Sequence, residues 1–202
     1  MNKQTEDIKA IREMMERSSK FQSLSGLSLV FAGLLACAGA AFAYCYLLRD
    51  PSSTNFNRNQ EILILLADAL LVLLLSVSVI TFFCYRKARQ NHQSLFSSVT
   101  KRAAYNLLIP LATGGIFSLL FLFRNEIEMV AASTLIFYGL ALINASKFTY
   151  SEIHYLGIAE IITGLLAAFV LHQGIWWWTS GFGLLHVIFG FLIYIKYDKT
   201  KK

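Results

Sequence analysis

Six long apolar segments constrain this chain more than any other feature of its sequence. They lie at about residues 24–48, 61–85, 103–123, 127–147, 153–172 and 176–197. Each has roughly the 20 residues that an α-helix needs to cross about 30 Å of hydrocarbon. Only 15% of the residues are charged, against about 25% in soluble proteins. The sequence therefore predicts an all-α integral membrane bundle of six transmembrane helices, forming one domain over residues 24–197.

The basic residues are distributed unevenly between the two ends of these segments. If the N-terminus is cytoplasmic, 15 of the 18 Lys and Arg residues fall on the cytoplasmic side, and only Arg49, Arg58 and Arg124 fall outside. This asymmetry predicts a multi-pass protein of the cell membrane with both termini in the cytoplasm. The net charge of +6 is then a topology signal. We expect anionic lipid headgroups as partners, and no nucleic acid.

Polar segments flank the apolar ones at both ends of the chain. Residues 1–23 carry Ile8, Ile11, Met15 and Phe21 near helical spacing, with charges between them. This pattern predicts an amphipathic helix lying in the cytoplasmic membrane interface. Residues 198–202 form a basic cytoplasmic tail.

Glycines mark the faces on which helices are expected to pack. Small residues let helix backbones approach closely in lipid. Three pairs are each separated by seven residues, or two helical turns: Gly26 and Gly33, Gly157 and Gly164, and Gly183 and Gly190. We therefore predict that the first, fifth and sixth spans pack closely through these glycines. Pro110 predicts a kink or an opened turn in the third span, because it has no backbone N–H.

Two ionisable residues lie deep in the last two spans, in segments of similar pattern. GIAEIITG (157–164) holds Glu160 in the slot that His186 fills in GLLHVIFG (183–190). The hairpin turn near Gly174 lies 14 residues from Glu160 and 12 from His186, so both are expected near the bilayer midplane. An unpartnered carboxylate there costs about 3 kcal/mol on insertion scales. Glu160 is therefore predicted to face the bundle interior and to pair with His186.

Such a pair has several interpretations. It is either an ion pair or a neutral acid bonded to a neutral imidazole, and the sequence leaves both open. Its role is either a proton-coupled or ligand-binding site, or a structural clip between adjacent helices that contributes about 0.6–2 kcal/mol. Asn144, Asn106 and Asp68 also lie within spans. They are candidates to line the same site.

The last two thirds of the chain resemble a group of small bacterial six-span membrane proteins. The resemblance lies in YGLALINASKFTYSEIHYLGIAEIITGLLAAF followed by GFGLLHVIFGFLIYIKYDK, and it implies the six-span architecture without a particular activity. The glycine-bearing hairpins are also similar, more loosely, to the HdeD-like acid-resistance membrane proteins. That similarity implies a pH-linked role for Glu160 and His186.

Familiar catalytic motifs are missing, including HExxH, GxSxG and the Walker loop. We therefore expect no enzyme activity, no cofactor and no metal site. Two functions follow. The first is a small solute-, lipid- or proton-binding, transport-like module with a polar intramembrane site around Glu160 and His186. The alternative is a non-catalytic membrane scaffold or sensor that engages a partner through its basic cytoplasmic face. A homodimer is compatible with either.

Overall fold

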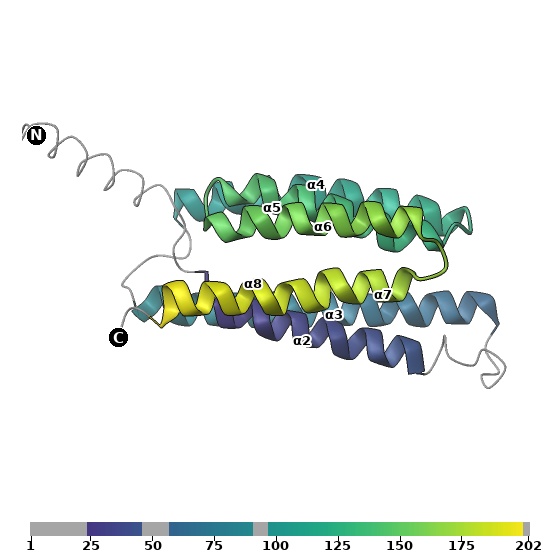
Figure 1. Ribbon diagram of the computed structural model, residues 1–202, viewed down its shortest axis with the longest axis horizontal. Coiled ribbons are helices and arrows are strands. Elements are labelled where there is room, and N and C mark those ends of the chain that lie inside the picture. The colour runs from purple at the N-terminus through teal and green to yellow at the C-terminus, as the bar shows by residue number, and fades with distance from the viewer. Residues whose placement is uncertain (1–23, 46–56, 91–96, 200–202) are drawn as a thin grey trace, which may run out of the picture.

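A computed structural model describes residues 24–45, 57–90 and 97–199, and its regular structure in these ranges is entirely helical (Figure 1). The elements are α2 (Gly26–Ala43), α3 (Arg58–Gln90), α4 (Ser98–Phe123), α5 (Glu128–Ser146), α6 (Ser151–Phe169), α7 (Gly174–Trp178), η3 (Thr179–Leu185), α8 (His186–Ile193) and η4 (Tyr194–Asp198). The last four elements form one continuous helix. Six helices are thus long and apolar enough to span a membrane, as predicted. The amphipathic helix predicted over 1–23 and residues 200–202 of the tail lie outside the described residues.

Two helices extend beyond the apolar segments that predicted them. The second span, expected at 61–85, lies within α3, which continues to Gln90. The added segment RKARQ consists of good helix formers, and Lys87 and Arg89 suit the negative end of the helix dipole. The third span, expected from 103, begins at Ser98, and the Ser97 side chain caps it by accepting a hydrogen bond from the Thr100 amide. Hydropathy therefore located these helices but underestimated their length.

π-Helical turns occur in the sixth span and not in the third. The opened turn expected at Pro110 is wrong, because α4 remains α-helical from Ser98 to Phe123. One proline removes a single intrahelical hydrogen bond, and membrane helices tolerate that loss. In contrast, η3 and η4 in the sixth span are π-helical. The sequence carried no proline to signal these segments.

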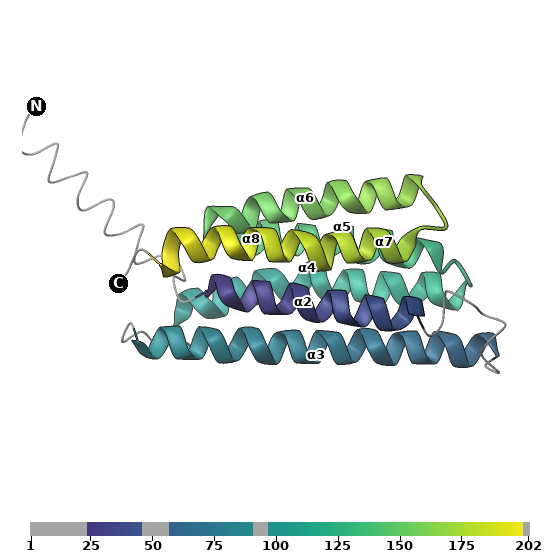
Figure 2. The same ribbon diagram turned by 60° about the horizontal axis from the view of Figure 1, so that its bottom comes forward.

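The helices form two layers of three (Figure 1). One layer contains α4, α5 and α6, with α5 in the middle. The other contains α3, α2 and the sixth span, with α2 in the middle, and Figure 2 shows α2 between α3 and α8. The α6–α7 turn leads from one layer to the other. We call the end of the bundle at Ser25 and Asp198 the inner end and the opposite end the outer end, after the predicted topology.

Glycines bring helices together within each layer. A methyl group added at Gly33 would lie 2.6 Å from the Gly183 carbonyl oxygen, and one added at Gly190 would lie 2.9 Å from that of Gly26. The first and sixth spans therefore do pack through their glycines.

The fifth span packs differently from the prediction. Its Gly157 and Gly164 face α5, where a methyl group added at Gly157 would lie 2.7 Å from the Gly139 carbonyl oxygen. The expected glycine contact of the fifth span with the first and sixth is thus wrong. The short turn after α5 places α6 antiparallel beside it, and Gly139 supplies the small surface that Gly157 requires.

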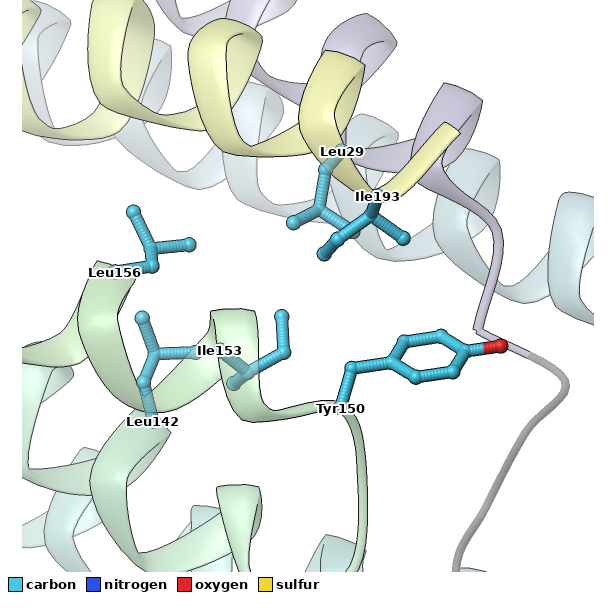
Figure 3. Close-up of a cluster of buried hydrophobic side chains, with 6 residues drawn as sticks. All are labelled: Leu29, Leu142, Tyr150, Ile153, Leu156 and Ile193. Atoms are coloured by element: carbon cyan, nitrogen blue, oxygen red, sulfur yellow. The ribbon is translucent and has the colours of Figure 1, made fainter. Parts of the chain in front are cut away.

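Apolar side chains fill the interface between the two layers. Toward the inner end, Leu29 and Ile193 of one layer pack with Leu142, Ile153 and Leu156 of the other (Figure 3). Toward the outer end, a second cluster contains Ala132, Leu135 and Ala167, with Trp177 and Phe182 packed against it. The polar residues of the candidate site belong to the same interlayer surface.

Candidate functional site

Glu160 and His186 meet at the interface between the layers. Glu160 is the central residue of α6, and His186 is the first residue of α8. Their exposed fractions are 0% and 4%, and His186 Nδ1 lies 3.3 Å from Glu160 Oε1. The structure thus brings together the two residues that the sequence placed at the same depth, one from each layer.

The hydrogen bonds of His186 define its tautomer. Nδ1 lies 3.1 Å from the carbonyl oxygen of Gly181, which can only accept, so Nδ1 carries a hydrogen and donates it. Nε2 lies 2.8 Å from the hydroxyl oxygen of Tyr138. In a neutral imidazole, Nε2 therefore accepts the hydrogen of the Tyr138 hydroxyl. The two rings are stacked, with centroids 5.4 Å apart, so Tyr138 of α5 both orients and covers the imidazole.

The carboxyl group of Glu160 lacks a hydrogen-bond donor. The Nδ1 contact is within ion-pair distance, but the Nδ1 hydrogen is directed to Gly181, and neither carboxyl oxygen has a hydrogen-bond partner among the described residues. A methyl group added at Gly181 would lie 2.5 Å from Oε2 and would collide with the Leu135 side chain. The carboxyl is therefore enclosed by the Gly181 backbone and Leu135, with no space left for a solute.

A change in helix type positions His186. The π-helical segment η3 ends at Leu185, directly before the histidine. The imidazole then bonds the carbonyl group five residues earlier in the same helix. π-Helical turns recur at functional sites because they alter the direction of side chains and carbonyl groups. Here the π-helical turn presents the Gly181 carbonyl to His186.

The other predicted site residues lie elsewhere. Asn144 accepts a hydrogen bond from exposed Lys147 at 3.2 Å, and Asn106 donates to the Arg102 carbonyl within α4 at 2.8 Å. Asp68 lies on α3 beside Gly39 of α2. Within the described ranges, none of the three forms a hydrogen bond or ion pair with Glu160 or His186. Depth along a span could be counted from the sequence, but the direction in which each side chain faces could not.

Tyr138 is a site residue that the sequence analysis missed. It lies in the middle of a span, whereas membrane tyrosines favour the interfaces. It also precedes Gly139, which follows Ala132 by the same seven-residue spacing as the other small pairs. Those two features together were a usable signal for a packed, inward-facing position.

A second polar cluster joins the layers at the inner end. Lys87 of α3 pairs with Asp198 at 2.5 Å and donates to the hydroxyl of Tyr150 at 3.2 Å. Asp198 also accepts from the Ser25 hydroxyl and the Gly26 amide. Burial, with a smaller contribution from Asp198, raises the pKa of the Tyr150 phenol above its ordinary value of 10.0. The cluster therefore ties α2, α3 and the C-terminal helix to the start of α6.

Comparisons with models of protein families, with curated proteins and with solved structures found no match to this chain.

Proposed function

We propose that this protein is a proton-binding integral membrane protein, in which Glu160 and His186 form the proton site. The observation that best supports this proposal is the fully buried Glu160 carboxyl, which has no donor although an imidazole lies 3.3 Å away. An ionised carboxylate without donors is very costly at membrane depth. A neutral Glu160 beside a neutral His186 would avoid that cost, and the proposal assigns the site this state in the present conformation.

Two features favour a proton over the other ligands considered. A solute or lipid needs space beside the carboxyl group, and Gly181 and Leu135 occupy that space. A structural clip would gain its stability from a hydrogen bond between Glu160 and His186, and the imidazole instead donates to Gly181. A proton requires no cavity. Its gain or loss changes which groups of the site can donate a hydrogen bond.

Proton exchange at this site would act on the contact between the layers. If Glu160 loses its proton, the nearest donor is His186 Nδ1, which must then leave Gly181 to reach Oε1. If His186 gains a proton at Nε2, that atom becomes a donor, and the Tyr138 hydroxyl must reverse its hydrogen bond. His186 and Gly181 belong to one layer, and Glu160 and Tyr138 belong to the other. Either event therefore changes the hydrogen bonds across the interface.

The setting proposed for this activity is a bacterial inner membrane with both termini in the cytoplasm. The inner end, which carries Lys87 and Lys196, would then face anionic headgroups. The resemblance to HdeD-like acid-resistance proteins is compatible with a proton-linked role. Association of two copies remains part of this proposal.

Infrared spectroscopy and spin-label distances would test the proposal together. The protein is reconstituted in nanodiscs, and infrared spectra are recorded between about pH 5.5 and pH 8, the range in which histidine titrates. In a cysteine-free background, spin labels at Leu34 of α2 and Ile162 of α6, both about half exposed, report the distance between the layers. Wild type, Glu160→Gln and His186→Gln are compared.

We expect a carboxylic-acid C=O band that decreases as the pH rises and that Glu160→Gln abolishes. The interlayer distance should change over the same pH range in wild type but not in Glu160→Gln. Glu152→Gln is the matched control, because it removes a carboxyl from the inner end of the same helix, where Lys196 pairs with it. If Glu160→Gln keeps the band, or if all variants show the same distance change, the proposal is wrong.

A further inference from the structure

Asp68 is an ionisable residue that the proton site does not use. It lies on α3, partly buried, and its carboxylate faces Gly39 of α2, where an added methyl group would lie 3.3 Å from Oδ2. Gly39 is about one turn before the end of α2 at Ala43. Asp68 therefore lies in the outer half of the second span, about two turns from its predicted outer end at residue 61.

A shallow, open groove between α2 and α3 has this carboxylate in its lining. It has a volume of about 370 Å³ and is lined by Phe42, Ile64, Ala67, Asp68 and Leu71. That volume falls within the range of small-molecule sites, roughly 300–1,000 Å³. Phe42 and Leu71 are 42% and 55% exposed, so the groove opens sideways, toward lipid in a membrane. Its walls are apolar apart from one carboxylate.

Among the described residues, no cation pairs with Asp68. Asp68 has no hydrogen bond or ion pair among the contacts of the described residues. Lysine and arginine are missing from the stretches of sequence that form the spans, which are residues 24–45, 59–85, 103–123, 125–146 and 148–195. A second copy of the chain would therefore bring no lysine or arginine to the depth of Asp68 either. A carboxylate within a membrane span is expected to have a partner, and a cation that comes from outside the chain can supply one.

We propose that this groove binds a single-chain organic ammonium ion that enters from the surrounding lipid. The ammonium group pairs with the Asp68 carboxylate in the outer half of the hydrocarbon, and the alkyl chain lies against Phe42, Ile64 and Leu71. Charge complementarity with Asp68 favours the ammonium group, and the apolar walls favour the alkyl group. This site is in the layer opposite Glu160 and does not depend on the proton site.

Equilibrium dialysis of labelled decylammonium against the full-length protein would test the proposal. The protein is held in phosphatidylcholine nanodiscs, whose headgroups have no N–H donor, and binding to empty discs is subtracted. We expect saturable binding to wild type and binding weaker by about tenfold or more in Asp68→Asn, since a hydrogen bond to a charged group is lost. Ala67→Leu, which narrows the groove and keeps the carboxylate, should also weaken binding.

The controls separate the groove from general effects of charge and lipid. Glu61→Gln removes a carboxylate two turns away on the same helix, outside the groove lining, and should bind like wild type, as should Glu160→Gln. Decanol, which has the same chain without the charge, should not distinguish wild type from Asp68→Asn.

Several results would overturn the proposal. The first is a lack of saturable decylammonium binding to wild type. The second is equal decylammonium binding to wild type and Asp68→Asn. The third is a preference of decanol for wild type over Asp68→Asn that equals the preference of decylammonium. A change from dimer to monomer in Asp68→Asn without any change in amine binding would instead assign Asp68 to an interface between copies. If decylammonium binds wild type and Asp68→Asn equally in discs that contain phosphatidylethanolamine, the occupant is a lipid headgroup.

Discussion

Replacing Gly157 by alanine tests the central packing contact of the layer that carries Glu160. A methyl group at this position would lie 2.7 Å from the carbonyl oxygen of Gly139 and 3.0 Å from the amide nitrogen of Ile143. Both are backbone atoms of α5 and cannot rotate away. An ordinary contact begins at 3.4 Å, so the two helices must separate by about 0.7 Å, from 2.7 Å to 3.4 Å, at this point.

The cost follows from the contacts that such a separation weakens. A gap of about 0.5–1 Å loses a quarter to a half of each dispersion contact, and α5 and α6 pack together along most of their length. Inserting a methyl group into a closely packed interface typically costs about 1–3 kcal/mol. Because the nearest atoms are backbone, we expect about 2–3 kcal/mol for Gly157→Ala.

The assay is reversible unfolding in mixed micelles of dodecyl maltoside and increasing sodium dodecyl sulfate, followed by circular dichroism. Gly115→Ala is the matched control, because no atom of the described residues lies within 4 Å of the added methyl group. It should be neutral or stabilising by up to about 1 kcal/mol, since alanine has less backbone entropy to lose. If Gly157→Ala is as stable as Gly115→Ala, the close contact between α5 and α6 is not as described.

Two further predictions concern the inner-end cluster. Lys87 and Asp198 are each only about one-eighth exposed, at 13% and 12%. A double-mutant cycle with Lys87→Met and Asp198→Asn, measured in the same micelle assay, should therefore give a coupling energy of about 1.5–3 kcal/mol, and a value near zero would contradict the pairing. Because burial raises the pKa of Tyr150, the Tyr150 phenol loses its proton at a lower pH in the unfolded state than in the folded state. Its contribution to stability is present below about pH 10 and is lost as the pH rises toward the folded-state pKa. Tyr150→Phe should flatten that loss in unfolding curves recorded across this range, and an unchanged slope would show that another group causes it.

The candidate site could be predicted in part. Counting residues from the hairpin turn placed Glu160 and His186 at one depth, and the structure has them 3.3 Å apart. The same counting added Asn106, Asn144 and Asp68, which the fold places at other surfaces. A count along a helix measures depth well because each residue adds a constant rise. It does not reveal how the helix is rotated or which neighbour it meets.

The sequence by itself determined the number of spans, their approximate limits and the depth of the two central ionisable residues. These properties depend on how each segment partitions between water and hydrocarbon, which is a local property of the segment. Only the tertiary structure decided that Gly157 faces α5, that Tyr138 bonds His186, and that Lys87 reaches Asp198. Lipid is as apolar as the side chains of a membrane helix, so hydropathy does not distinguish a helix partner from the surrounding lipid. The choice of partner depends instead on the fit of small residues and on the satisfaction of buried polar groups, and both arise only when the helices are assembled.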